Sequence, residues 1–270
     1  MTLKNIVFFV CGHMATAIVQ GLKKQGLPAG NLCIVDRSPQ ASQKKALALG
    51  VQFAADIRTA IEQADVLVLS VKPQQMQALC EDISQYLPKP GLLFISVAAG
   101  VRLASLHAWL GGDFPVVRAM PNMPSQIGCG MTGLFAAESV SSEDQKTAAL
   151  LLGAVGAILW FSKESRLDAV TAVSGSGPGY VFLFMEAIQN AAVALGLSLE
   201  EAEKLAKQTV FGAANLALSS DLSLKTLREQ VTSPGGTTQA GLEALENAGL
   251  CDIISTAISA ANERAKALSK

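Results

Sequence analysis

Short apolar runs alternate with amphipathic stretches between residues 5 and 119 of the chain. The runs are rich in Val, Ile and Leu, which is typical of parallel strands covered by helices on both faces. Strands are expected at Asn5–Val10, Asn31–Val35, Val66–Ser70, Leu92–Val97 and Pro115–Ala119. Helices are expected between them at Met14–Gln25, Pro39–Leu49, Asp56–Gln63, Pro73–Tyr86 and Leu103–Leu110. This alternation predicts an α/β domain with a doubly wound, Rossmann-like sheet.

After Trp160 the pattern becomes helical, and no further strand is expected. Apolar residues recur at three- and four-residue steps, as on one face of a helix. They include Leu199, Ala202, Ala206, Val210 and Ala213, and later Ile254, Ile258, Ala261, Ala265 and Leu268. The segment Gly179–Leu195 is apolar nearly all round, which predicts burial on every side. A helical domain of about a hundred residues is small for burying such a helix on every side, so we expect a partner subunit. We place the domains at residues 1–162 and 163–270.

Composition excludes several classes of protein. Half of the 270 residues are hydrophobic and 16% are charged, so the chain is not disordered. The net charge of −1 argues against nucleic acid or an anionic membrane as a partner. The weakly charged stretch 168–199 carries Glu186, Gln189 and Asn190 in its middle, which indicates a buried helix rather than a membrane span. We expect a soluble, cytoplasmic protein.

The cysteines show no spacing that is typical of a disulfide framework or a zinc site. There are five, scattered along the chain and mostly inside apolar runs: Cys11, Cys33, Cys80, Cys129 and Cys251. We therefore expect buried, reduced thiols, and no metal.

The first expected strand leads into Cys11-Gly12-His13-Met14-Ala15 and a helix. A dinucleotide fold carries G-x-G-x-x-G/A at this point. Gly12 takes the place of the second glycine, which lets the backbone approach the pyrophosphate, and Ala15 takes the place of the third. Val10 stands where the first glycine belongs. On this motif alone, an ordinary connection between strand and helix remains an equal alternative.

The ends of the later strands support a dinucleotide site. The second strand ends at Asp36-Arg37-Ser38, where an acidic residue can hold the ribose hydroxyls and Arg37 with Ser38 suits a 2′-phosphate. These residues leave the choice between NADH and NADPH open. Two further strands end at small residues, 70–73 and 96–100, which lets a flat ring lie against the backbone.

Three motifs in the later part of the chain carry a resemblance. They are Arg118-Ala119-Met120-Pro121-Asn122-Met123-Pro124, Ser174-Gly175-Ser176-Gly177-Pro178-Gly179-Tyr180, and Val231-Thr232-Ser233-Pro234-Gly235-Gly236-Thr237-Thr238. With Val71-Lys72-Pro73 and Ala98-Ala99-Gly100, they resemble the pyrroline-5-carboxylate reductase family in order and spacing, from the first strand to about Ala267. The last of the three motifs is the most specific.

The resemblance implies an oxidoreductase that reduces the cyclic imine 1-pyrroline-5-carboxylate to L-proline with NAD(P)H, the last step of proline biosynthesis. It also implies a dinucleotide-binding domain, an all-α dimerisation domain, and an active site shared between subunits. The expected cofactor is NADP, with NAD as the alternative. The expected assembly is at least a homodimer, with a higher ring of dimers as the alternative.

By position, the family's contacts transfer to this chain. The implied cofactor contacts are Val10, Cys11, Gly12, His13, Met14, Asp36, Arg37, Ser38, Ser70, Val71, Lys72, Pro73, Val97, Ala98 and Ala99. The implied substrate contacts are Glu164, Ser233, Gly235, Gly236, Thr237 and Thr238, with Thr238 as the catalytic residue that bonds the ring nitrogen. The chain departs from the family pattern mainly in its cofactor half, at Val10, Cys11, His13 and Ile57.

The residues themselves are compatible with imine reduction. An imine nitrogen is basic enough to be protonated near neutral pH, so positioning can supply most of the acceleration. The glycines of the loop 233–238 leave backbone N–H groups open for a small carboxylate at the start of a helix. The other interpretation is a helix cap made by Ser233 or Thr237, and both can hold at once because they use the same N–H groups. Likewise, the glycines of 174–179 could have a functional role, or they could only allow two helices to pack closely.

Two other functions remain to be separated from this one. One is a reductase of another small carbonyl or imine acid on the same two-domain plan. Carbonyl reduction would need a proton donor, typically a lysine in the helical domain, and the motifs at 174–180 and 231–238 point away from it. The other is a non-catalytic dinucleotide-binding assembly protein, in which the altered glycine turn no longer holds the cofactor. Titration of the reduced nicotinamide cofactor with the protein, followed by cofactor fluorescence, measures binding and so tests for such a non-catalytic protein.

Overall fold

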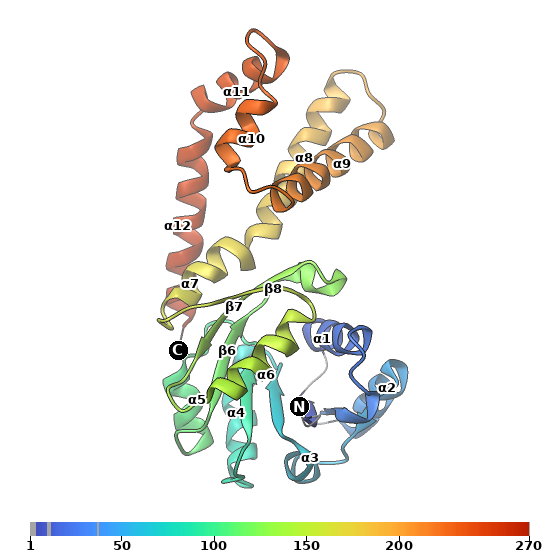
Figure 1. Ribbon diagram of the computed structural model, residues 1–270, viewed down its shortest axis with the longest axis vertical. Helices are drawn as coiled ribbons and strands as arrows, with labels where there is room; N and C mark the ends of the chain where they lie inside the picture. The colour runs from blue at the N-terminus through green and yellow to red at the C-terminus, as the bar shows by residue number, and fades with distance from the viewer. Residues whose placement is uncertain (1–3, 10–11, 37, 270) are drawn as a thin grey trace. The chain divides into compact units, whose positions relative to one another are not determined.

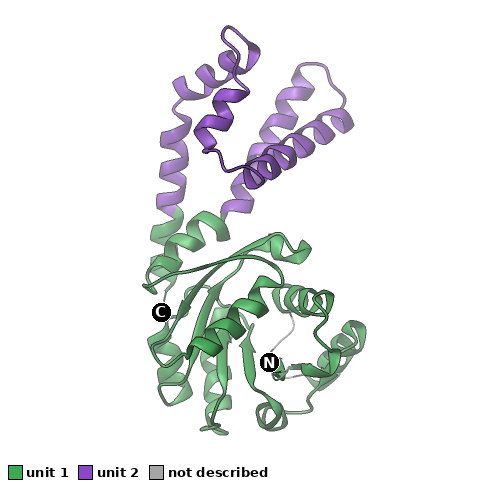
Figure 2. Cartoon of the chain, viewed as in Figure 1, with its two compact units in different colours: residues 1–176, 261–270 green, residues 177–260 purple. Residues whose placement is uncertain are grey.

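The computed structural model describes residues 4–9, 12–36 and 38–269 of the chain. These residues fold into two compact units, Met1–Ser176 with Ala261–Lys270 and Gly177–Ala260 (Figure 2). The last helix of the chain contributes to both units. The domain boundary at residue 163 remains a prediction, because the compact units do not follow a single cut of the chain.

The first unit contains an eight-stranded sheet in the order β3-β2-β1-β4-β5-β6-β7-β8 (Figure 1). The pairs are parallel except for β6 with β7. The strands are β1 (Ile6–Phe9), β2 (Leu32–Val35), β3 (Gln52–Phe53), β4 (Val66–Leu69), β5 (Leu93–Ser96), β6 (Val116–Met120), β7 (Gly130–Ala136) and β8 (Gly156–Trp160). This topology confirms the expected doubly wound fold, with its switch point between β1 and β4.

The expectation of only five strands was wrong, because β3, β7 and β8 were missed. β3 has only two residues. The outer strands begin with glycines that their neighbours require. A Cβ at Gly130 would lie 2.8 Å from the carbonyl oxygen of Val155, and one at Gly133 would lie 2.8 Å from a methyl group of Val170. Close packing therefore requires glycine there. Because glycine has no apolar side chain, it interrupts the pattern by which a strand is predicted.

Helices cover both faces of the sheet. On one face, the core combines the apolar strand residues with α1 (His13–Lys24), α2 (Pro39–Leu49) and α6 (Ser142–Gly153). On the other, it combines them with α3 (Ile57–Gln63), α4 (Pro73–Ser84) and α5 (Leu103–Leu110). The starts of α2 and α4 follow from proline in the first turn, whose fixed φ suits a helix.

A π-helical segment follows the short helix α7 (Arg166–Val170) in the first unit. It is labelled η3 (Thr171–Gly175), and the Ser176 N–H donates to the Thr171 carbonyl at 2.8 Å. A Cβ at Gly175 would lie 2.7 Å from the terminal methyl group of Met120. Packing against Met120 therefore accounts for this glycine of the 174–179 motif. The unit also contains the 3₁₀ segments η1 (Ala29–Asn31) and η2 (Met123–Ile127).

The second unit is helical, as expected. It contains α8 (Gly177–Ala194), α9 (Leu199–Leu218), α10 (Leu224–Gln230), α11 (Thr237–Asn247) and the first part of α12 (Leu250–Leu268). A reciprocal capping box between Ser198 and Glu201 starts α9. None of the described residues of α8 is buried in the single chain, and Leu183 is 66% exposed. The expected burial of this helix is therefore not found within one chain.

None of the helices in the described ranges is long and apolar enough to cross a membrane. The expectation of buried thiols is correct for Cys33 and Cys80, whose pKa values burial raises to about 11 and about 12. It is wrong for Cys129 and Cys251, which are exposed in the single chain. Cys11 lies outside the described residues.

Candidate cofactor and substrate sites

The expected cofactor segments come together at one edge of the sheet. β2, β1, β4 and β5 are adjacent and parallel, so the segments that follow them share the carboxyl edge. The Ser70 hydroxyl donates to the Phe9 carbonyl at 2.8 Å and joins the ends of β4 and β1. Lys72 is the N-cap of α4, and Val97 follows β5 directly. Three of the expected contacts, Val10, Cys11 and Arg37, lie outside the described residues.

The N-terminus of α1 is shaped for an anion. Gly12 is its N-cap, with extended backbone and no side-chain cap, and the first turn carries no acidic residue. A Cβ added at Gly12 would meet no atom within 4 Å, so the space in front of the helix is open. His13 is exposed at the first helical position, followed by Met14. Free N–H groups at the start of a twelve-residue helix fit a pyrophosphate.

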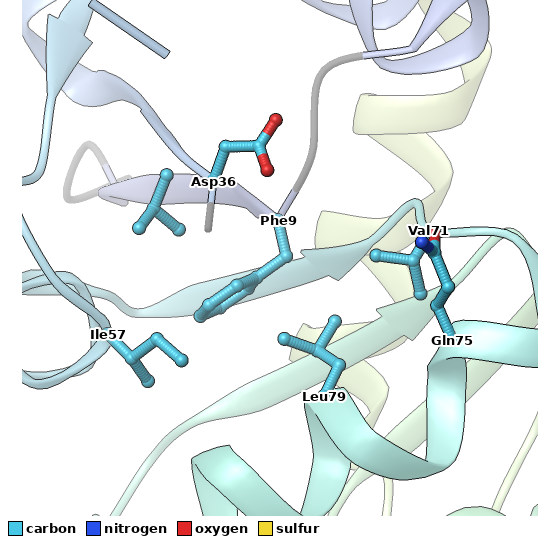
Figure 3. A pocket seen from close by; sticks show the side chains of 7 residues that line it. Phe9, Asp36, Ile57, Val71, Gln75 and Leu79 are labelled. Atoms are coloured by element: carbon cyan, nitrogen blue, oxygen red, sulfur yellow. The ribbon is translucent and has the colours of Figure 1, made fainter. Parts of the chain in front are cut away.

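A cavity of about 100 Å³ lies at the carboxyl ends of β1 and β2, where Phe9, Val35 and Asp36 line it. Figure 3 shows the Asp36 carboxylate above the apolar side chains of Phe9, Ile57 and Leu79. Apolar walls suit a flat base, and the carboxylate can accept hydrogen bonds from ribose hydroxyls. Ser38 is the N-cap of α2 and makes no side-chain cap, so the start of this helix is also open to a phosphate.

The expected substrate residue Glu164 has structural partners. Its Oε1 atom accepts from the Arg118 guanidinium at 2.6 Å and from the Leu103 N–H at 2.6 Å. The carboxylate therefore caps the N-terminus of α5 and compensates the charge of Arg118, which is only 4% exposed. Burial lowers the pKa of Arg118, and the hydrogen bond and charge of Glu164 oppose that shift. No hydrogen bond reaches Oε2 within the described part of the chain, so this oxygen is available to a ligand.

Arg118 was not among the expected site residues. Its signal in the sequence is an arginine inside the apolar strand Val-Val-Arg-Ala-Met, because a charge in a buried strand requires a partner. The identity of that partner, 46 residues further along the chain, is set by the tertiary fold.

Replacement of Glu164 by glutamine is expected to lower the free energy of unfolding by about 1 kcal/mol, because an acceptor remains but the charge opposite Arg118 is lost. Urea unfolding measures the change. Glu62→Gln is the matched control, since Glu62 pairs with Arg58 at an exposed position and should have less than about half that effect. Equal effects of the two variants would show that the Arg118–Glu164 pair contributes no more to the free energy of unfolding than an exposed pair does.

In the second unit, the loop 233–238 is held from both ends. The Thr232 hydroxyl donates to the Arg228 carbonyl at 2.6 Å, and the Gly235 N–H donates to the Gln239 side-chain oxygen at 2.7 Å. Gly235 has a φ of +69°, a left-handed conformation that favours glycine. The Gly236 N–H donates to the Ser233 carbonyl at 3.0 Å, so both loop glycines use their N–H groups and the expectation that these groups are open is wrong. The open N–H groups at the start of α11 are instead those of Thr237 and Thr238.

The N-cap of α11 is Gly236, and no side chain caps this helix. The alternative of a cap by Ser233 or Thr237 is therefore wrong. Thr238 is the second residue of α11 and is exposed, and its hydroxyl has no hydrogen bond among the described residues. The eleven-residue helix thus presents open N–H groups and a free hydroxyl on its first turn. Such a turn can hold a small carboxylate and one further polar atom.

The two histidines offer no acid–base pair. The His107 ring nitrogens lie 3.0 Å from the Phe114 carbonyl oxygen and 3.1 Å from the Asp113 carboxylate, as in a structural contact. In the described ranges, no three His, Cys, Asp or Glu side chains are grouped to hold a metal ion. The arrangement is thus one that binds and orients a ligand.

Comparisons with known proteins agree with this arrangement. Residues 164–268 match the family model for pyrroline-5-carboxylate reductase dimerisation, and residues 5–100 match the model for NADP oxidoreductase, coenzyme F420-dependent. The pyrroline-5-carboxylate reductase of Pseudomonas aeruginosa is 44% identical, over 100% of this chain and 98% of that protein. A pyrroline-5-carboxylate reductase structure from Coxiella burnetii is 43% identical, with a TM-score of 0.96 and 100% of both chains covered. The NADP-bound structure of Plasmodium falciparum pyrroline carboxylate reductase is 29% identical, with a TM-score of 0.85 over 100% of both chains.

Proposed function

The chain belongs to the pyrroline-5-carboxylate reductase family, and we propose that the first turn of α11 holds the substrate of that family's reaction. The reaction reduces the C=N bond of 1-pyrroline-5-carboxylate to L-proline with NAD(P)H. The observation that carries the proposal is the uncapped N-terminus of α11, with the exposed, unpaired hydroxyl of Thr238 on its first turn.

The residues of this turn have distinct roles. The backbone N–H groups of Thr237 and Thr238, with the Ser233 side chain and the adjoining Gly235 and Gly236, surround the substrate carboxylate. The Thr238 hydroxyl accepts a hydrogen bond from the protonated ring nitrogen and keeps the bond as the nitrogen becomes an amine. Because the substrate arrives already protonated, the chain needs no strong acid, which fits the absence of a histidine pair among the described residues. In the first unit, the second oxygen of Glu164 is a further candidate for contact with the substrate.

The carboxyl edge of the sheet binds the cofactor, which supplies the hydride when bound. We assign the adenosine half to Asp36 and the cavity beside it, and the pyrophosphate to Gly12, His13 and Met14. The nicotinamide half would be held by the segment Ser70, Val71, Lys72 and Pro73, which follows β4, and by the segment Val97, Ala98 and Ala99, which follows β5. The residues Asp36, Arg37 and Ser38 fit NADP, because Ser38 starts α2 without a side-chain cap and leaves the start of this helix open to the 2′-phosphate.

Cofactor choice is testable at Arg37. The Arg37→Ala variant is expected to lower the preference for NADPH over NADH about tenfold, because a charge-assisted hydrogen bond to a 2′-phosphate contributes about 1.5–3 kcal/mol. Steady-state kinetics with both cofactors measures the ratio, and Lys24→Ala, at the opposite end of α1, is a charge-matched control. A wild-type protein that prefers NADH would contradict this proposal and give Asp36 the deciding role.

The dimerisation model matches the helical part of this chain, which supports a homo-oligomer. We further propose that the active site is completed by a second subunit and that dimers assemble into a larger ring. The exposed apolar residues of α8 are the observation that favours burial between chains.

The decisive test is turnover of purified protein with 1-pyrroline-5-carboxylate and each reduced cofactor, followed by loss of nicotinamide absorbance and by formation of proline. Cofactor binding without turnover would favour a non-catalytic protein. Turnover of a small carbonyl or other imine acid in preference to 1-pyrroline-5-carboxylate would assign the loop to a different substrate.

A further inference from the structure

A buried carboxylate in the first unit joins two segments that are far apart in the sequence. Asp168 on α7 is only 4% exposed. Its Oδ2 atom accepts from the Arg102 guanidinium at 2.6 Å, and its Oδ1 atom accepts from the Ser269 hydroxyl at 2.9 Å. Both oxygens are therefore used by partners 66 and 101 residues away. We call Arg102, Asp168 and Ser269 the Asp168 clamp.

The clamp borders the segment that follows β5. Arg102 is the N-cap of α5, so it ends the loop that begins at Val97. On the other side of the clamp, the last turn of α12 approaches the same loop, since a Cβ at Gly100 would lie only 3.0 Å from the Leu268 carbonyl oxygen. Gly100 has a φ of +73°, so the loop turns sharply at this contact. The loop is thus held both at its end and at its turn.

A cavity of about 250 Å³ lies on this contact. Its lining joins the clamp and the end of α12, through Asp168 and Leu268, to the two cofactor segments, through Pro73 and Ala99. A shift of the clamp therefore changes the walls next to both segments. A buried ion pair contributes little net stability once its desolvation is counted, so its main effect is expected on geometry.

We propose that Asp168 is a positioning residue that holds the Val97–Ala99 segment in place for the nicotinamide half of the cofactor. It does so through its hydrogen bonds to Arg102 and to Ser269 in the C-terminal turn. The proposal rests on the assignment of that segment to the cofactor. Through Ser269, which directly follows α12, the C-terminal turn then acts on the cofactor site indirectly.

The test compares two ligands on the full-length protein by calorimetry. NADPH carries both halves, whereas 2′,5′-ADP carries the adenosine half with its 2′-phosphate and no nicotinamide. Asp168→Asn keeps the size of the side chain and is expected to raise the Kd for NADPH about tenfold, because a charged partner of Arg102 is lost. Ser269→Ala is expected to raise it about threefold. The Kd for 2′,5′-ADP should change less than about twofold in both variants.

Asp144→Asn is the matched control, because Asp144 forms a partly buried ion pair with Lys4 in the same unit and should leave both Kd values unchanged. Equal weakening of both ligands by Asp168→Asn would show a general structural role and overturn the proposal. If Asp168→Asn does not fold, Ser269→Ala at the end of the chain decides the question by the same ratio.

Ala99→Leu separates this inference from the cofactor assignment. Ala99 is exposed, so the larger side chain fits the fold and obstructs only a ligand that lies on the loop. If Ala99→Leu leaves NADPH binding unchanged, the assignment of the segment to the cofactor is wrong. If it weakens NADPH binding while Asp168→Asn and Ser269→Ala do not, the assignment stands and the clamp has no positioning role.

Discussion

Replacement of Thr238 by alanine is expected to lower kcat/KM for 1-pyrroline-5-carboxylate about ten- to a hundredfold, because a hydrogen bond to a charged group contributes about 1.5–3 kcal/mol. The hydroxyl is exposed on the first turn of α11 and has no partner among the described residues, so its loss leaves no protein group unsatisfied. The effect should therefore appear in the reaction and not in stability. Steady-state kinetics with the imine varied at saturating cofactor measures it.

Thr238→Ser keeps the hydroxyl and should lose far less activity than the alanine variant. Thermal melts of both variants should match the wild type, since Gly236, and not Thr238, is the N-cap of the helix. Thr209→Ala, at an exposed position on α9, is the control for loss of a surface hydroxyl. Similar kinetics of the alanine and serine variants would remove Thr238 from the mechanism.

A charge in the middle of α8 is expected to break the assembly. The Ala187→Asp variant should be monomeric at concentrations at which the wild type is at least a dimer, because a buried, unpaired carboxylate costs several kcal/mol. Ala187 is exposed in the single chain, so the aspartate does not disturb the fold of the unit itself. Light scattering coupled to size exclusion measures the mass, and circular dichroism checks that the helices remain.

Ala78→Asp, at an exposed position inside α4, is the control for introducing the same charge into a helix, and it should leave the mass unchanged. Activity should fall with dimer content if the active site is shared between subunits. A wild-type protein that is monomeric and active would contradict both the assembly and the shared site.

The inner strands and the helices between them could be predicted because each is encoded locally. The helices α2 and α5 have the predicted bounds, β1, β2, β4 and β5 lie inside the predicted strands, and β6 extends one residue beyond its predicted end. The reason is that a strand buried on both faces is a continuous apolar run, and a covering helix shows its own spacing of apolar residues. Prolines at the first positions of α2 and α4 mark their starts.

The outer strands could not be predicted in this way. Gly130 and Gly133 in β7 are required by neighbours at Val155 and Val170, which follow much later in the chain. The pairing of β7 is antiparallel with β6 and parallel with β8, and no local pattern distinguishes these alternatives. The local signal is weak there because the packing that selects each residue is long-range.

The site divides in the same manner. The motifs around Gly12, Asp36 and the loop 233–238 could be located in the sequence by their glycines and their spacing, and the comparisons confirm the family that they indicate. The sequence alone left open whether Ser233 or Thr237 caps α11. The structure excludes both, because the backbone places Gly236 at the N-cap.

By itself, the sequence determined the doubly wound sheet, the helical second half and the family, since these depend on local periodicity and on motifs that lie within a few residues. Only the tertiary structure decided which of the buried charges are paired. The partners Arg118 with Glu164 and Arg102 with Asp168 are 46 and 66 residues apart, and the Ser269 hydroxyl reaches Asp168 across 101 residues. A charged residue inside an apolar run indicates in the sequence that a partner is needed. The identity of that partner depends on the fold, which brings two distant segments within hydrogen-bonding distance.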